Sequence, residues 1–196
     1  MCIRDRLCWE YPVNKNINYF VPPLFKDVRE KLANELEDFI KRLKISDKEK
    51  KELRTYYQKV WTLVTSGEIK LELDLHFEDE ENKYVVDFKS GFSSNEKGNT
   101  NRLLLVASIY QILEEGHKCL LFVRSAEEKN NHYLQTLKKS GLWIVFCGQE
   151  TYKQIKNMTG FNLSSWLKLN VDWKKDFDSK MYNHLKENNL TQYLEW

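Results

Sequence analysis

Two short apolar runs, separated by one helical stretch, constrain the fold more than any other feature of this chain. Residues 119–123 and 143–147 are continuous apolar runs, as expected for strands that are covered on both faces. Residues 130–139 between them are typical of a helix, which Gly141 would terminate. A strand, a helix and a second strand in this order predict a parallel pair with a right-handed crossover. We therefore expect a buried α/β sheet.

A hairpin is predicted upstream of this unit, because residues 69–77 and 83–89 both alternate between apolar and polar side chains. The polar face of the first strand carries Glu72, Asp74 and His76. The same face of the second strand carries Asp87 and Lys89. The two carboxylates and the lysine on one face are the strongest chemical signal in the chain, whereas we expect His76 to lie only at the rim of that site.

A turn over residues 79–82 would place Asp74 opposite Asp87 and Glu72 opposite Lys89. Two carboxylates that face each other across an antiparallel pair repel, because their Cβ atoms are only about 5 Å apart. A hard divalent cation such as Mg²⁺ between them would remove the repulsion, and Lys89 would add a fixed positive charge. The alternative interpretation is the solvated face of a half-buried hairpin.

Helices are expected on either side of the hairpin in the sequence. Residues 102–113 are apolar almost all the way round, which predicts a helix buried against more than one neighbour, with Asn99 or Thr100 as its cap. Residues 24–43 and 47–64 have the periodicity of amphipathic helices. The predicted fold is α/β, with a mixed central sheet in which the antiparallel hairpin joins the parallel crossover strands, flanked by helices.

These elements carry a family resemblance. Asp74, the triplet Asp87, Phe88 and Lys89, and the downstream order of helix, strand, helix and strand resemble the PD-(D/E)xK nuclease superfamily. That group includes many type II restriction endonucleases, RecB-type exonucleases, mismatch-repair nickases and Holliday-junction resolvases. The resemblance covers about residues 47–148 and implies a restriction-endonuclease-like core. A leucine precedes Asp74 where the family name has proline.

Within the superfamily, the polar loop of residues 92–100, which leads directly to Arg102, is most similar to type II restriction enzymes. The RecB-type subgroup usually has a Gln and a Tyr one helical turn apart, where this chain has Val106 and Tyr110. Lys97 and Arg102 flank the predicted site and are therefore candidate DNA contacts.

The resemblance implies Mg²⁺-dependent hydrolysis of DNA phosphodiester bonds, with Mn²⁺ as a substitute. Asp74, Asp87 and the backbone carbonyl of Phe88 would ligate the metal. Lys89 would orient the attacking water and contact the phosphate, since phosphoryl chemistry depends mainly on positioning and electrostatics. Glu72 would take part in a second metal site or tether Lys89.

The length of 196 residues predicts one domain. We expect its core over residues 47–148, an N-terminal helical segment over 1–46 and a C-terminal helical appendage over 149–196. Glu35 and Glu52 are weaker carboxylate candidates on the two upstream helices, and each is more simply a surface residue.

Beyond Gly148, aromatic residues are interleaved with lysines. The aromatic residues are Trp166, Trp173, Phe177, Tyr182, Tyr193 and Trp196, and the lysines are Lys168, Lys174, Lys175, Lys180 and Lys186. Such residues can stack bases and contact phosphates. We favour the other interpretation, a pair of terminal helices packed on the core or on a second subunit.

Composition agrees with such an enzyme but does not identify it. The net charge of +2 excludes a strongly basic non-specific coat. The cysteines have no metal-binding spacing, and Cys119 and Cys147 are expected as buried thiols in a reducing cytoplasm. Residues 1–10 lack the apolar core of a secretory signal, resemble leaders in assembled environmental sequences, and are left out of the fold prediction.

A restriction enzyme that cuts both strands of a palindrome would usually be a two-fold dimer, and a DNA methyltransferase would be encoded nearby. Three alternatives stay open. The first is a repair or recombination nuclease of the same fold, the second is a non-catalytic nucleic-acid-binding or assembly module, and the third is an unrelated α/β protein.

Overall fold

The computed structural model describes residues 3–13, 16–64, 69–93, 96–113 and 116–194. The chain divides into two compact units. One comprises Met1–Phe20 together with Asp74–Trp196, and the other comprises Val21–Leu73. The first unit contains the whole sheet. The predicted domain limits, with a core over residues 47–148, stay a prediction.

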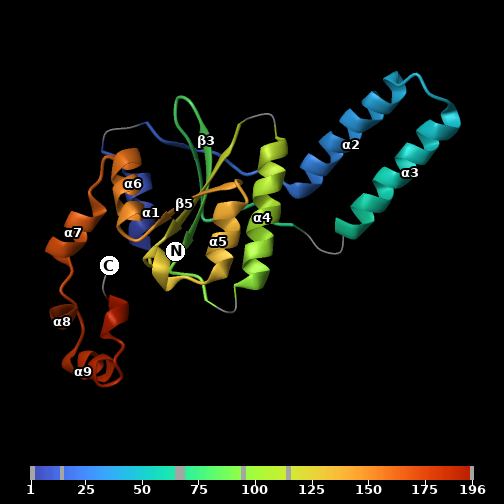
Figure 1. Ribbon diagram of the computed structural model, residues 1–196. Helices are drawn as coiled ribbons and strands as arrows, with labels where there is room; N and C mark the ends of the chain where they lie inside the picture. The colour runs from blue at the N-terminus through green and yellow to red at the C-terminus, as the bar shows by residue number, and fades with distance from the viewer. Residues whose placement is uncertain (1–2, 14–15, 65–68, 94–95, 114–115, 195–196) are drawn as a thin grey trace. The chain divides into compact units, whose positions relative to one another are not determined.

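A five-stranded mixed sheet forms the centre of the first unit (Figure 1). Its strands are β1 (Asn18–Tyr19), β2 (Leu75–Glu78), β3 (Lys83–Lys89), β4 (Lys118–Val123) and β5 (Trp143–Cys147), and they lie in this order across the sheet. The first three strands pair antiparallel, whereas β3, β4 and β5 pair in parallel. The predicted α/β class and mixed sheet are confirmed, and β1 was not predicted.

The predicted hairpin register is confirmed, because Glu78 lies opposite Lys83 on the two sides of the turn. The predicted length of the first strand is wrong, since β2 begins at Leu75 and not at residue 69. The reason lies at Asp74, whose Oδ2 accepts a hydrogen bond of 2.9 Å from the backbone N–H of Phe88. The Asp74 side chain, and not a backbone carbonyl, therefore accepts the Phe88 N–H, and the β2–β3 hydrogen-bond ladder ends there.

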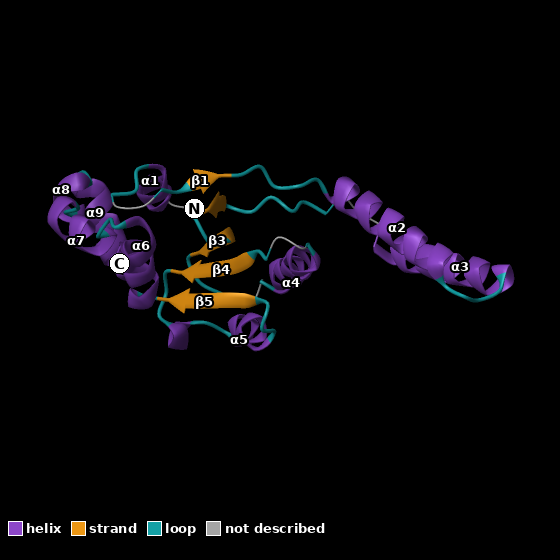
Figure 2. Cartoon of the chain, turned by 90° about the horizontal axis from the view of Figure 1, so that it is seen from above, coloured by secondary structure: helices purple, strands orange, loops and turns teal. Residues whose placement is uncertain are grey.

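Helices cover both faces of the sheet (Figure 2). One face packs against α1 (Ile3–Glu10), α6 (Gln149–Thr159) and α7 (Leu163–Asn170). The strand residues in this core are Leu75, Phe77, Tyr84, Val86, Phe88, Leu120 and Phe122. The other face lies under α4 (Lys97–Ile112) and α5 (His132–Lys139). Because side chains alternate along β3, Asp87 and Lys89 point to the face under α4.

Helix α1 belongs to the core, although its segment had been left out of the fold prediction. Trp9 is 0% exposed, and its ring centroid lies 4.6 Å from that of Phe77 and 6.0 Å from that of Phe122. Cys8 is buried beside it in the same cluster. The pattern of a buried Cys-Trp pair between polar residues is too short to predict a helix from sequence.

Helix α4 confirms the predicted buried helix but begins earlier than expected. Its N-cap is Glu96, whose carbonyl accepts the N–H of Thr100 at 2.8 Å, so neither Asn99 nor Thr100 caps it. Thr100 is a buried residue inside the first turn. Leu105 and Ile112 are exposed, which shows that one side of this apolar helix faces outward.

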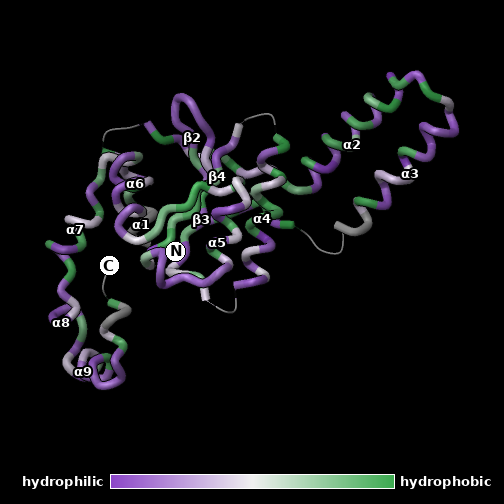
Figure 3. The backbone as a smooth tube through the Cα atoms, in the orientation of Figure 1, coloured by the Kyte–Doolittle hydropathy of each residue, from purple (hydrophilic) through white to green (hydrophobic). Residues whose placement is uncertain are grey.

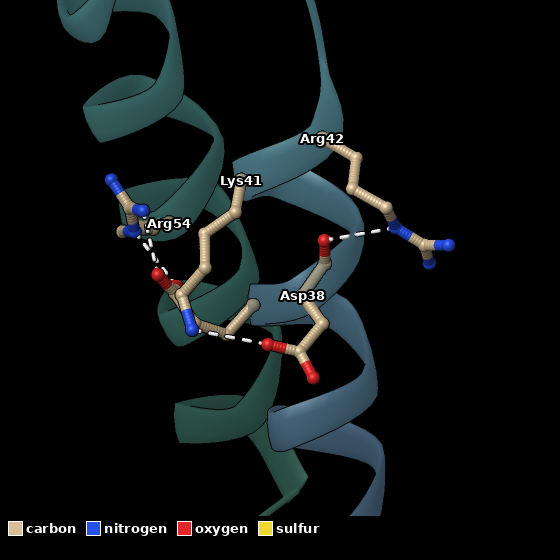
Figure 4. Close-up of polar contacts among 5 residues, drawn as sticks. Asp38, Lys41, Arg42 and Arg54 are labelled. Carbon is tan, nitrogen blue, oxygen red and sulfur yellow. Dashed lines mark hydrogen bonds and ion pairs between the residues drawn. The ribbon is translucent and has the colours of Figure 1, made fainter.

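The second unit contains a pair of helices, α2 (Phe25–Arg42) and α3 (Asp47–Val64), which confirms both amphipathic predictions. Arg54 of α3 donates two hydrogen bonds to Glu37 of α2, from Nε to Oε2 at 2.8 Å and from Nη2 to Oε1 at 2.6 Å. Figure 4 shows Arg54 reaching from its helix to the neighbouring one. This bidentate pair fixes the rotational setting of the two helices.

The C-terminal segment folds into short helices, α7 followed by α8 (Trp173–Asp176), α9 (Ser179–Glu187) and a 3-10 turn at Thr191–Leu194. Helix α7 buries Leu163 and Leu167 in the core, whereas α8 and α9 bury none of their described residues. In Figure 3 the central strands are hydrophobic, whereas α9 is largely polar. The predicted packing on the core is therefore confirmed for α7, and packing of α8 and α9 on a second subunit stays a prediction.

The burial of each strand cysteine depends on the position of its strand in the sheet. Cys119 is buried, and burial raises its pKa to about 12. Cys147 is only half-buried, because β5 is the last strand of the sheet. Both are free thiols. No helix in the described part of the chain has the length and apolarity needed to cross a membrane, and the compartment stays a prediction.

The substitution Trp9→Ala should lower the free energy of unfolding by about 3–5 kcal/mol, because it empties a fully buried aromatic site. Tyr11→Ala is the matched control, since Tyr11 is 73% exposed, and it should change stability by less than about 0.5 kcal/mol. Urea unfolding followed by circular dichroism measures both. Equal stability of the two variants would show that α1 is not part of the core.

Candidate functional site

Asp87 and Lys89 form a buried ion pair at the carboxyl end of β3. Their spacing of two residues puts both side chains on one face of the strand, and Lys89 Nζ lies 2.8 Å from Asp87 Oδ2. The side chain of Asp87 is 4% exposed and that of Lys89 is 21% exposed. The carboxylate is therefore enclosed, whereas the lysine side chain is partly exposed.

Asp74 is fixed beside this pair by the hydrogen bond that Phe88 N–H donates to its Oδ2. Phe88 follows Asp87 directly in the chain, so the carboxylate of Asp74 is hydrogen-bonded to the backbone next to Asp87. Asp74 is half-buried. The structure thus brings together Asp74, Asp87 and Lys89, the three residues that carried the sequence prediction.

The electrostatics of the site leave Asp87 short of positive charge. Burial raises the pKa of its carboxyl, and the neighbouring charge of Asp74 raises it further. Lys89 and Arg102 act in the opposite direction without cancelling the effect of burial. Ionised Asp87 would therefore gain from an additional cation placed beside it.

The donor set fits a hard divalent cation that keeps much of its hydration. Among the described residues, the hydrogen bond of Asp74 and the ion pair of Asp87 both involve Oδ2, so a metal held here would use Oδ1 of each side chain. No group of three or more His, Cys, Asp or Glu side chains in the described part of the chain is arranged to hold a metal. Mg²⁺ needs no such group, because one or two carboxylates, water and substrate phosphate suffice. The carbonyl of Phe88 stays a predicted ligand.

Loops at the carboxyl ends of the parallel strands support the site. The N–H of Arg124 donates to the carbonyl of Lys89 at 2.9 Å, which joins the ends of β3 and β4. Asn130 Oδ1 accepts the N–H of Phe92 at 2.7 Å and the hydroxyl of Ser125 at 3.1 Å. Asn130 thereby positions the chain that leaves β3, a role that no sequence motif indicated.

Two glycines allow these loops to approach closely. A Cβ at Gly91 would lie 2.8 Å from Ser125 Oγ, so the loop after β3 has no room for a side chain there without a shift. Gly148 has a φ of +53°, and a Cβ on it would lie 3.3 Å from the Cα of Ala126. Both glycines lie at the edge of the sheet where ligands of open α/β folds usually bind.

Three of the other predicted site residues belong to the second unit, and two lie on α4. Glu72, Glu35 and Glu52 belong to the second unit and are exposed, so their roles stay predictions. Lys97 and Arg102 are exposed on the first turns of α4. Arg102 is near enough to Asp87 for its charge to act on that carboxyl, which agrees with its predicted place beside the site.

The expectation that His76 lies at the rim of the site is wrong. His76 is 6% exposed, and its Nε2 lies 3.3 Å from the hydroxyl of Tyr110 on α4. Its ring also makes an edge contact with Phe20 at a centroid distance of 5.5 Å. Helix α4 covers this part of the sheet, so His76 is a core residue.

Comparison of the chain with family models, with curated proteins and with solved structures finds no match.

The bond from Phe88 to Asp74 gives a test that is independent of activity. Asp74→Ala should accelerate hydrogen exchange of the Phe88 amide by about 5-fold to 150-fold, which corresponds to about 1–3 kcal/mol for a lost charged acceptor. Asp74→Asn retains an acceptor oxygen and should largely preserve the protection. NMR exchange measurements on both variants check this. Unchanged protection in Asp74→Ala would show that the bond is not formed.

Lys89→Ala should lower the free energy of unfolding by about 3 kcal/mol at neutral pH, because it leaves the buried Asp87 carboxylate without its partner. The pKa of Asp87, already above its ordinary 3.8, should rise further. Folded protein then retains a proton that unfolded chain releases, so stability falls as pH rises from that ordinary value to the raised one.

Lys118→Ala, at an exposed position of β4, is the control for this prediction and should not show the pH dependence. Urea unfolding across the acid to neutral range measures both variants. A stability loss in Lys89→Ala that does not change with pH would contradict the pairing with a buried Asp87.

Proposed function

We propose that this protein is a Mg²⁺-dependent deoxyribonuclease with a restriction-endonuclease-like core, and that it acts as a type II restriction endonuclease. The observation that supports it most is the buried pair of Asp87 and Lys89 at the end of a central strand, with Asp74 bonded to the next backbone amide. Buried charges of this kind are costly to keep, and they concentrate where chemistry is done.

Asp74 and Asp87 would hold the metal, with Mn²⁺ as a substitute for Mg²⁺. The bound metal would lower the pKa of water and neutralise charge on the scissile phosphate. Lys89 is suited to contact that phosphate, because its ammonium group lies beside Asp87 and its side chain is partly exposed. It would fix the phosphate and orient the attacking water relative to the two carboxylates.

DNA is the proposed substrate because helix α4 presents exposed cations that can bind its phosphates. Lys97 and Arg102 are exposed on α4, and Arg102 acts on the charge of Asp87. Both can contact phosphates on either side of the scissile bond. A two-fold dimer and a methyltransferase encoded nearby remain expectations of the restriction-enzyme assignment. A repair or recombination nuclease of the same fold would use the same three residues.

A second candidate is a non-catalytic nucleic-acid-binding module, and one observation favours it. Asp74 accepts the Phe88 N–H, so its carboxylate also has a purely structural use at the end of the β2–β3 ladder. In that case Asp87 and Lys89 would be a structural ion pair, and the protein would bind DNA without cutting it.

Plasmid cleavage in Mg²⁺ distinguishes the two candidates. Wild-type protein should cut, and Asp87→Ala should lose at least about 100-fold in rate, since it removes a carboxylate from the reacting centre. Glu81→Ala changes an exposed carboxylate of the β2–β3 turn and should cut like wild type. Circular dichroism verifies that each variant is folded. Equal cutting by folded Asp87→Ala would contradict the assignment, and absence of cutting by wild type would favour the binding module.

A further inference from the structure

A cavity of about 630 Å³ lies in the C-terminal segment, away from the carboxylates of the candidate site. Residues from α7, α8, α9 and the final 3-10 turn line it, so it is built entirely from the part of the chain whose aromatic and lysine residues stood out in the sequence. The residues that matter here are Lys168, Asp172, Trp173, Lys174, Lys175 and Tyr182.

The charge of the lining favours an anion. Three lysines line the cavity against a single carboxylate, Asp172, which lies 3.1 Å from Lys175 Nζ. Lys168 and Lys174 are exposed, so they can contact a ligand from solvent. A phosphate, or a chain of phosphates, is the matching chemistry.

The aromatic residues add a second preference. Trp173 is held in place, because its indole N–H donates to the carbonyl of Leu194 at 2.8 Å and its ring stacks on Phe177 at a centroid distance of 5.3 Å. Tyr182 of α9 lines the same cavity and is half-buried. Fixed rings beside lysines are the combination that holds unpaired bases by stacking while cations follow the backbone.

The size of the cavity is compatible with a single nucleotide. Its volume falls within the range of about 300–1,000 Å³ that is usual for small-ligand sites, which suits a nucleotide that has left its stack. A duplex keeps its bases stacked inside and would offer only its phosphates to Lys168 and Lys174. The aromatic lining would then have no partner.

We propose that this cavity, formed by α7, α8 and α9, binds a single-stranded segment of nucleic acid, with a base against Trp173 and Tyr182 and phosphates on Lys168 and Lys174. The assignment deepens the proposed nuclease function and rests on it. It names an unpaired strand as the form of nucleic acid that the C-terminal segment binds. The contact needs neither the metal nor Asp87.

Fluorescence anisotropy with a labelled oligothymidylate of about 16 nucleotides tests the proposal in EDTA, with wild-type full-length protein. Lys168→Glu with Lys174→Glu should raise Kd by at least about fivefold and reduce the salt slope by about 0.7 per lysine. Lys156→Glu with Lys186→Glu is the control, because both residues are exposed, lie outside the cavity lining and give the same change of charge.

The aromatic contribution is tested by Tyr182→Ala, which should raise Kd by at least about fivefold through the lost stacking. Trp166→Ala is its control, since Trp166 is 41% exposed and lies outside the lining. Equal weakening by the control lysines would show diffuse charge attraction and overturn the proposal. So would unchanged binding of the single strand in Tyr182→Ala.

The two proposals fail separately. Loss of the oligonucleotide contact in a protein that still cuts plasmid would overturn only the cavity assignment. Intact and cavity-dependent binding by a protein that never cuts would overturn only the nuclease assignment.

Discussion

The ion pair of Asp87 and Lys89 lies in the middle strand of the sheet, and the geometry of the candidate site depends on it. Lys89 compensates part of the cost of burying Asp87, and the N–H of Phe88, between them in the chain, holds Asp74 in place. A buried ion pair is seldom more stabilising than well-packed apolar residues of similar volume. Its presence at the buried end of a central strand is therefore better explained by chemistry than by stability.

The parts of the fold that could be predicted are those in which one local pattern determines the burial. The apolar runs became β4 and β5, and the alternation of residues 83–89 became β3. The predicted ends of two elements were wrong because a single side chain or an earlier N-cap determined where the element begins. Asp74 ended β2 by accepting a backbone N–H, and Glu96 began α4 before the expected caps. Helix α1 and strand β1 are too short to have a periodicity, and only tertiary packing around Trp9 identifies α1 as part of the core.

The site divides in the same way. Asp87 and Lys89 could be predicted because strand parity alone puts residues two apart on one face. Asn130 could not, since its role depends on contacts with Phe92 and Ser125 that join separate loops at the edge of the sheet. The burial of His76 depends likewise on Tyr110, which lies 34 residues away in the chain. Long-range contacts of this kind leave no trace in local spacing.

The proposed chemistry requires Asp74 and Asp87 to hold a divalent cation together. Anomalous diffraction from crystals grown with Mn²⁺ tests it most directly, because the scattering of the metal locates the ion without reference to activity. We expect an anomalous peak in contact with carboxylate oxygens of both Asp74 and Asp87, which is lost in crystals of Asp87→Asn. A well-ordered crystal with both side chains defined and no peak between them would rule out a metal held by these two residues.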